Sequence, residues 1–192
     1  MQAGPKSETL NPKLETNKMD TISTFQQAVR DIPDFPKEGI VFKDITPVLR
    51  DPELCLAILD ELHDRWVGQG VDVVAGIESR GFLFGMGLAM RLGVPFVPIR
   101  KEGKLPAETV KTSYELEYGE AVIEMHKDAI HSDHKVLIHD DLLATGGTAR
   151  AAADLIQKVG GGVAGFSFLI ELDFLNGREK LGDGRVDSLV NY

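Results

Sequence analysis

The middle of the chain alternates between short runs of aliphatic and β-branched residues and longer segments with the apolar period of a helix. This alternation predicts parallel strands joined by right-handed helical crossovers, because each helix must return the chain to the same end of the sheet. We therefore predict an α/β fold in which a mostly parallel central sheet has helices on both faces. The predicted strands are 71–77, 94–99, 121–126, 135–139 and 165–172, and the predicted helices among them are 81–93 and 148–159.

The N-terminal third of the chain is predicted to contain two further helices. Ser23 followed by Gln26 is a capping-box pattern, so we expect a helix that begins near Ser23 and is ended by Pro33 and Pro36. The segment DPE at 51–53 provides an acidic cap, a proline and a carboxylate, which is typical of a second helix start.

Composition limits the class of protein. The chain has 192 residues and one cysteine, Cys55, which excludes an intrachain disulfide framework and the usual cysteine-based zinc site. Its formal charge of −9 argues against non-specific binding to nucleic acid or to an anionic membrane. Residues 1–20 are polar and contain Pro5 and Pro12, without the apolar core of a signal peptide. We expect a cytoplasmic protein with a mobile extension over residues 1–20 and a single domain over residues 21–192.

The most informative segment is the strand, loop and helix over residues 135–156. The predicted strand ends in two adjacent carboxylates, Asp140 and Asp141, and a short loop over residues 142–147 follows. Small residues and two glycines allow the loop's backbone N–H groups to surround a phosphate at the positive end of the helix dipole. The carboxylates would bind sugar hydroxyls or bring Mg²⁺. A plain strand, turn and helix with a solvated acidic tip is the alternative. The expected phosphate-binding residues are Ala144, Thr145, Gly146, Gly147 and Thr148.

A polar stretch over residues 100–119 has no clear period. A structureless connection of this length is unusual inside a compact domain, and it is more often a functional lid than a passive loop. A β-hairpin within this stretch is the alternative.

The segment VLIHDDLLATGGT resembles the signature of the type I phosphoribosyltransferases. Further segments narrow the resemblance to the adenine phosphoribosyltransferase family, and they occur in that family's order. His139 departs from the family, which usually has an aliphatic residue there. Its side chain should point away from that of Asp140, so we expect it to pack rather than react. The further segments are DFPKEGIVFKDITPVLRDP (34–52), GIESRGFLFG (76–85), IRKEGKLP (99–106), SYELEYG (113–119) and ELDFLNGREKL (171–181), so the resemblance extends from about residue 23 to the C-terminus.

The resemblance implies a three-layer type I phosphoribosyltransferase fold with a small base-binding hood. It implies Mg²⁺-dependent transfer of the phosphoribosyl group from 5-phosphoribosyl-1-pyrophosphate (PRPP) to adenine, giving AMP and pyrophosphate in purine salvage. Mg²⁺ would be held mainly by the substrate, with Asp140 and Asp141 nearby. The family also implies a homodimer, and neither nucleic acid nor a membrane is expected as a partner.

Individual residues take roles from the same resemblance. The turn after the strand 71–77 would bind pyrophosphate and contain a non-proline cis peptide bond, Glu78–Ser79. Phe42 would stack on adenine, while Glu117 would carry a proton of its imidazole side. The expected catalytic residues are Glu117, Asp140 and Asp141; the pyrophosphate-binding residues are Glu78, Ser79, Arg80, Arg100, Lys101 and Lys104; and the base-binding residues are Val41, Phe42 and Lys43.

Plainer interpretations and rival functions stay open. Arg80 alone would be a surface arginine, Phe42 a core aromatic and Glu117 an exposed helical glutamate. A non-catalytic regulator would keep the fold to sense a nucleotide and bind nucleic acid, although the acidic charge argues against it. An enzyme for hypoxanthine or orotate would need a specific side-chain donor, whereas GIVFKD (39–44) offers mainly backbone groups.

Overall fold

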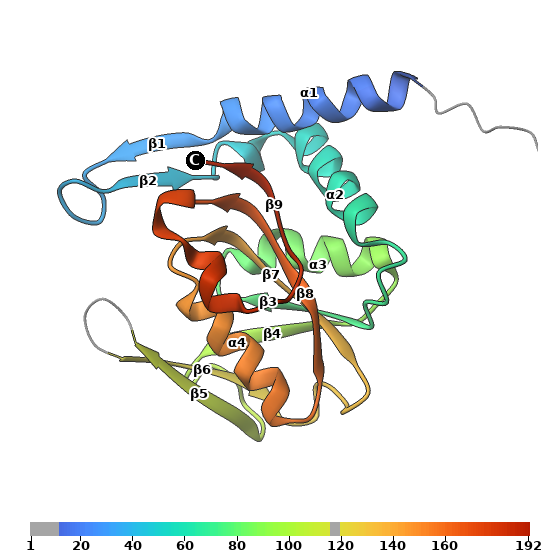
Figure 1. Ribbon diagram of the computed structural model, residues 1–192, viewed down its shortest axis with the longest axis vertical. Helices are drawn as coiled ribbons and strands as arrows, with labels where there is room; N and C mark the ends of the chain where they lie inside the picture. The colour runs from blue at the N-terminus through green and yellow to red at the C-terminus, as the bar shows by residue number, and fades with distance from the viewer. Residues whose placement is uncertain (1–11, 116–119) are drawn as a thin grey trace, which may run out of the picture. The chain divides into compact units, whose positions relative to one another are not determined.

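Figure 1 shows the computed structural model, which describes residues 12–115 and 120–192. Residues 1–11 of the predicted extension lie outside this range. The chain divides into two compact units with a boundary between Ile58 and Leu59. Within the described ranges, no helix combines the length and the apolar character needed to cross a membrane.

The first unit contains a long helix and a two-stranded antiparallel sheet (Figure 1). Asp51 caps the helix α2, because its Oδ1 accepts hydrogen bonds from the N–H groups of Glu53 and Leu54 at 3.1 and 3.0 Å. The predicted start of this helix is therefore confirmed. The elements are α1 (Pro12–Ala28), β1 (Arg30–Pro33), β2 (Val41–Asp44), the 3-10 helix η1 (Val48–Arg50) and α2 (Pro52–Trp66), which continues into the second unit.

Helix α1 differs from its prediction at both ends. It begins at Pro12 and not near Ser23, and Ser23 Oγ accepts a hydrogen bond from Gln27 Nε2 at 3.2 Å within the helix. A proline is tolerated at the first helical position because its missing N–H would have no helical partner there. The helix ends at Ala28, well before Pro33, because the residues that follow pair with β2.

The second unit contains a seven-stranded sheet with the order β5-β6-β4-β3-β7-β8-β9. The five strands from β4 to β9 in this order are parallel, and β5 and β6 form an antiparallel hairpin at one edge. The mostly parallel sheet is confirmed. Its strands are β3 (Val73–Ile77), β4 (Phe96–Lys101), β5 (Thr109–Glu115), β6 (Glu120–His126), β7 (Lys135–Leu143), β8 (Gly162–Glu171) and β9 (Val186–Asn191), and its helices are α3 (Gly81–Leu92) and α4 (Gly147–Lys158).

Helices α3 and α4 cover opposite faces of this sheet, as alternate residues of β3 make clear (Figure 1). Ala75 and Ile77 belong to the same buried cluster as Leu155 of α4. Gly76, between them, faces α3, and a Cβ at this position would lie 3.0 Å from the carbonyl oxygen of Gly81. Because β3 and β7 are parallel neighbours, the loops that follow them emerge at the same edge of the sheet.

His139 is fully buried on the face of β7 that α3 covers. Its Nδ1 lies 3.2 Å from Ser167 Oγ, and a Cβ at Gly85 of α3 would lie 3.4 Å from its Cδ2. Burial lowers the pKa of His139 to about 4, so its imidazole is neutral near pH 7. The residue packs, as the sequence predicts.

The stretch over residues 100–119 contains regular structure, so its prediction as an irregular connection is wrong, whereas its role as a lid stays a prediction. It holds the end of β4 and, after a turn, all of β5, which pairs with β6 from Thr109↔His126 to Glu115↔Glu120. The alternative, a β-hairpin, is confirmed. Polar side chains hide it because an edge hairpin needs only one apolar face.

After β8 the chain forms two short 3-10 helices, η2 (Asp173–Leu175) and η3 (Gly177–Leu181), before it returns as β9. Leu181 is buried in the same apolar cluster as Leu143 at the end of β7. η3 also lies close to the loop that follows β7, because a Cβ at Gly177 would lie 3.0 Å from Leu143 Cδ1. No pattern in the sequence predicts η3 or β9.

Candidate active site

The phosphate loop, residues 144–148, joins β7 to α4. Gly146 is the N-cap residue of α4 with a φ of +77°, and its carbonyl oxygen accepts a hydrogen bond from the Arg150 N–H at 2.9 Å. The N–H groups of the first helical turn therefore have no helical acceptor and are available to an anion. The five expected phosphate-binding residues line one cavity of about 80 Å³, together with Asp140, Leu142, Leu143, Ala149 and Phe168.

The two carboxylates of the signature lie beside this cavity. Asp141 is only 3% exposed, and its N–H donates a hydrogen bond to Asp140 Oδ1 at 2.9 Å. The start of α3 packs against Asp140, because a Cβ at Gly81 would lie 2.6 Å from the His139 carbonyl oxygen and 3.0 Å from Asp140 Oδ1. The alternative of a solvated acidic tip is therefore wrong.

Burial changes the charge balance of this pair. Burial and the neighbouring Asp141 carboxylate raise the pKa of Asp140 well above its ordinary value. Burial also raises the pKa of Asp141, although Arg80 opposes this effect. Two carboxylates in this setting favour a cation or a hydroxyl donor next to them.

The loop between β3 and α3 contains Glu78, Ser79 and Arg80, and the peptide bond Glu78–Ser79 is cis, as expected. Arg80 Nε lies 3.0 Å from Asp141 Oδ2, which joins this loop to the carboxylate pair. Although the Arg80 side chain is 37% exposed, this ion pair anchors it at the site.

Arg100, at the end of β4, is held by Glu78. The two carboxylate oxygens of Glu78 accept hydrogen bonds from Arg100 Nε at 3.1 Å and Nη2 at 3.2 Å, and the Lys101 N–H donates to Glu78 Oε2 at 3.1 Å. Burial opposes the ionisation of Glu78, but these bonds outweigh it and the pKa of Glu78 lies below its ordinary value. The structure thus brings together the ends of β3, β4 and β7, as the predicted site requires.

Glu124 of β6 supports the candidate site, and no sequence pattern indicates its role. Its Oε1 accepts hydrogen bonds from the N–H groups of Lys104 and Leu105 at 2.9 and 3.0 Å, and its Oε2 accepts one from Thr109 Oγ1 at 3.2 Å. Burial opposes its ionisation, yet these bonds lower the pKa of Glu124. Glu124 fixes the turn that carries Lys104. Its partners precede it by 15 to 20 residues, so no local pattern indicates the contact.

Comparison with known proteins decides the family. The family model described as "Phosphoribosyl transferase domain" matches residues 49–182. The adenine phosphoribosyltransferases of Thermobifida fusca and Sorangium cellulosum are 54% and 58% identical to this chain, over 171 and 169 residues. These alignments cover 89% and 85% of this chain and 97% and 84% of the relatives. The chain belongs to the adenine phosphoribosyltransferase family.

Solved structures of the family agree with the fold. The adenine phosphoribosyltransferase of Thermoanaerobacter pseudethanolicus has a TM-score of 0.87 at 51% identity and covers 89% of this chain and 99% of its own. That of Saccharomyces cerevisiae, complexed with adenine and an imino-altritol bisphosphate, has a TM-score of 0.85 at 42% identity and covers 90% and 99%. The type I phosphoribosyltransferase fold that the resemblance implies is confirmed.

The residues that the family resemblance assigns to the base lie on β2 in the first unit. Val41 is exposed and Phe42 half-buried, and the Phe42 ring meets the Phe35 ring edge to face at a centroid distance of 5.2 Å. Lys43 Nζ donates a hydrogen bond to Asp31 Oδ1 at 2.7 Å, so its side chain is already engaged within the hairpin. The prediction for Glu117 falls outside the described residues.

A divalent metal fits the carboxylate pair. Asp141 Oδ2 is buried and accepts no hydrogen bond, although Arg80 Nε lies within ion-pair distance. Mg²⁺ usually binds through one or two carboxylates together with phosphate oxygens of its substrate. No cluster of three or more His, Cys, Asp or Glu side chains occurs in the described parts of the chain. Asp140 and Asp141 would therefore supply a part of the ligands, and the substrate the rest.

Proposed function

We propose that the protein catalyses the Mg²⁺-dependent transfer of the phosphoribosyl group from PRPP to adenine, giving AMP and pyrophosphate in purine salvage. The observation that carries the proposal is the adjacent pair Asp140 and Asp141 beside a cavity lined by the phosphate loop. Membership of the adenine phosphoribosyltransferase family supports the choice of substrates, and the yeast relative is complexed with adenine.

In this proposal the phosphate loop binds the 5′-phosphate of PRPP. Its backbone N–H groups donate to the phosphate oxygens, and the dipole of α4 favours the negative charge. The carboxylates of Asp140 and Asp141 repel a phosphate, so they would face the ribose hydroxyls instead. A sugar phosphate fits this arrangement, because its phosphate can bind the loop while its hydroxyls bind the carboxylates at the strand end.

Breaking the bond at the anomeric carbon places positive charge on the ribose ring, as in glycoside hydrolysis. Asp140 and Asp141 would stabilise this charge, because fixed carboxylates near a developing cation lower its energy without reorganising at the moment of reaction. The start of α3 packs against Asp140 and Asp141 is only 3% exposed, so contact with water is limited and the effect is stronger.

The leaving pyrophosphate is assigned to the loops after β3 and β4. Ser79 and Arg80 contribute from the first loop, and Lys101 and Lys104 from the second. Glu78 acts in this assignment by holding Arg100 in place. In a chain with a charge of −9, these cations offset the repulsion that a pyrophosphate would otherwise meet.

Adenine is assigned to β2 on the family resemblance. Phe42 would stack on the base, while main-chain groups of Val41 and Lys43 would read its edge. Glu117 would accept the proton that the imidazole side loses as the new bond forms. When bound, Mg²⁺ would neutralise negative charge on the leaving pyrophosphate.

The cellular setting is part of the same proposal. We expect a cytoplasmic homodimer whose residues 21–192 act as one functional domain. The match of the phosphoribosyl transferase domain to residues 49–182 crosses the boundary between the two compact units, which supports a single domain.

A direct assay tests the proposal. The purified protein is incubated with PRPP and labelled adenine, hypoxanthine or guanine, with Mg²⁺ or with a chelator. We expect labelled AMP from adenine in the presence of Mg²⁺ and no nucleotide in the other reactions. Product from hypoxanthine alone would favour the enzyme for another base. An inactive protein that binds nucleic acid tightly would favour the regulator.

A further inference from the structure

The 3-10 helix η3 packs directly on the phosphate loop, backbone against backbone. A Cβ at Gly146 would overlap the carbonyl oxygen of Gly177, and a Cβ at Gly177 would overlap the carbonyl oxygen of Ala144. Lys180 adds a further contact, since its Cβ would lie 3.3 Å from a Cβ at Gly146. The side of the loop that faces η3 therefore has no room to move toward it.

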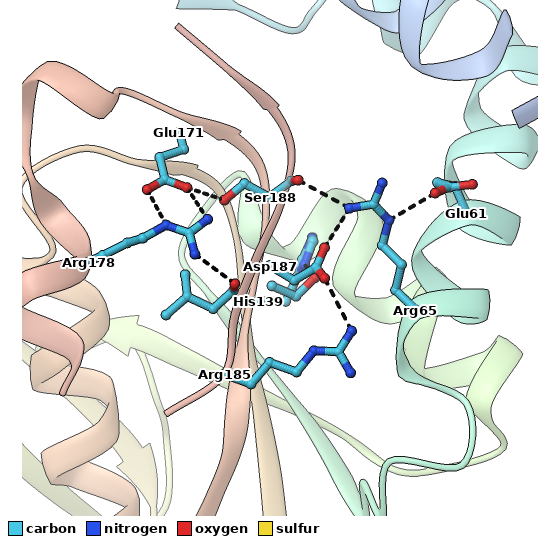
Figure 2. Close-up of polar contacts among 10 residues, drawn as sticks. Glu61, Arg65, His139, Glu171, Arg178, Arg185, Asp187 and Ser188 are labelled. Atoms are coloured by element: carbon cyan, nitrogen blue, oxygen red, sulfur yellow. Dashed lines mark hydrogen bonds and ion pairs between the residues drawn. The ribbon is translucent and has the colours of Figure 1, made fainter. Parts of the chain in front are cut away.

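Arg178 ties η3 to the two neighbouring strands, as Figure 2 shows. Its Nε and Nη2 donate to the two carboxylate oxygens of Glu171 on β8 at 2.5 and 2.6 Å, and its Nη1 donates to the carbonyl oxygen of Val186 on β9 at 2.9 Å. A bidentate pair between arginine and carboxylate fixes direction as well as distance. The position of Gly177, next to Arg178, is therefore set by β8 and β9.

The Glu171 side chain, which Arg178 binds, is itself held firmly by burial and by a further hydrogen bond. It is 3% exposed, lies opposite Leu143 in the pairing of β7 with β8, and accepts a further hydrogen bond from Ser188 Oγ at 2.7 Å. Burial opposes the ionisation of Glu171, but the bonds from Arg178 and Ser188 bring the pKa of Glu171 below its ordinary value. A buried carboxylate held in this way does not readily exchange its partner.

A phosphate site made of backbone N–H groups depends on where the backbone is. A displacement of about 1 Å weakens hydrogen bonds from several donors at once, with effects that reach about 100-fold. We propose that Arg178 and Glu171 are positioning residues, which hold Gly177 against Ala144 and Gly146 and so keep the phosphate loop shaped for the 5′-phosphate. This inference rests on the proposed function, because it concerns the same loop.

Replacing Arg178 tests the inference through ligands that differ in their phosphate. For Arg178→Gln we expect the affinity for AMP and for ribose 5-phosphate to fall about tenfold or more, and KM for PRPP to rise similarly, because the loop loses its support. KM for adenine should change less than about twofold, since adenine has no phosphate to place in the loop. Arg178→Lys keeps the positive charge but can make only one contact with Glu171, so its loss of affinity for AMP should be intermediate.

The matched control is Arg65→Gln. Arg65 of α2 also binds a carboxylate and a carbonyl oxygen of β9, with Nη1 2.7 Å from Asp187 Oδ1 and 3.2 Å from the Ser188 carbonyl oxygen, and its Nε lies 2.9 Å from Glu61 Oε1 on α2. It bonds to no residue of η3 (Figure 2). We expect it to lower the melting temperature as much as Arg178→Gln does, while AMP affinity stays within about twofold of wild type.

Two results would overturn the inference: equal losses for AMP and adenine in Arg178→Gln, or a loss of AMP affinity in Arg65→Gln as large as in Arg178→Gln. Unchanged AMP affinity in Arg178→Gln would overturn it as well. A wild-type protein that binds neither AMP nor ribose 5-phosphate would contradict the proposed function instead.

Discussion

The two regions of the second unit that we assign to anions are built in opposite ways. The phosphate loop relies on its backbone, and none of the described residues that line its cavity carries a positive charge. The region at the ends of β3 and β4 relies on cations, and carboxylates hold them: Arg80 lies beside Asp141, and Glu78 binds Arg100. Anion binding by a backbone site depends on steric fit. Anion binding by paired cations depends on their charge and on the carboxylates that hold their side chains.

Because of this difference, we expect ligand binding in the two regions to respond differently to substitutions and to salt. The phosphate loop should respond strongly to a single added methyl group and weakly to salt, because its donors are neutral. The cation region should respond to lost charge and to ionic strength. Four substitutions test the contrast, starting with the largest expected effect.

Gly146→Ala should lower the affinity for ribose 5-phosphate about 100-fold. The new Cβ would overlap the Gly177 carbonyl oxygen, and the φ of +77° disfavours any L side chain, so the loop must shift. Isothermal titration calorimetry measures the change. Gly93→Ala is the control, because Gly93 has a similar φ of +70° but open space around its Cβ. A phosphate affinity equal in the two variants would contradict a backbone-built site.

Arg100→Gln should raise KM for PRPP about tenfold, because a cation whose direction is fixed by Glu78 is lost. Arg100→Lys should recover part of the loss, and the difference should shrink at high salt. Steady-state kinetics at two ionic strengths measures both effects. The surface pair of Lys127 with Glu108 provides the control, and Lys127→Gln should leave KM unchanged. If the effect of Arg100→Gln did not depend on salt, it would contradict the prediction that the cation region depends on charge.

Glu124→Leu should destabilise the protein by about 1–3 kcal/mol, because the N–H groups of Lys104 and Leu105 lose their acceptor. Glu124→Gln should cost less, since its amide oxygen can accept both bonds and its NH₂ can donate to Thr109 Oγ1. Denaturant unfolding compares the variants. If Gln proved as harmful as Leu, the negative charge of Glu124 would matter more than its hydrogen bonds.

The smallest effect concerns pH. The folded protein lowers the pKa of Glu171 below its ordinary value of 4.5, so the stabilisation from its ionised form is fully present above that value. It is lost as the pH falls through the lowered pKa. The advantage of wild type over Glu171→Gln in melting temperature should therefore be constant near neutral pH and shrink in acid. An advantage that persisted unchanged in strong acid would show that Glu171 acts without its charge.

The sequence predicts the conformation of residues 135–156 well because the parts of this segment are adjacent. The strand, the carboxylates, the glycines and the helix start follow one another, so local rules place them without knowledge of the rest of the chain. The resemblance also gives the cis peptide bond Glu78–Ser79, which no local rule would predict. The assignments of Glu117 and of the base-binding residues stay predictions.

What the sequence does not reveal depends on contacts between distant segments. In the sequence Asp141 looks like a solvated residue, but in the fold it is buried beside Arg80. Glu124 looks like an ordinary strand residue, but in the fold it binds the turn at Lys104. Arg178 sits in a run of mixed charge, and only the return of β8 and β9 shows what it binds. Helix α1 is longer than predicted because a proline can begin a helix as well as interrupt one.

The absence of a side chain at Gly81 has a mechanical consequence. Its backbone lies against the His139 carbonyl oxygen and Asp140 Oδ1, so the first turn of α3 and the end of β7 touch without any flexible group between them. The loop before α3 and the carboxylate pair therefore cannot slide past each other, and they must move as one rigid piece. The spacing between the groups assigned to pyrophosphate and those assigned to ribose is built into the backbone before either ligand arrives.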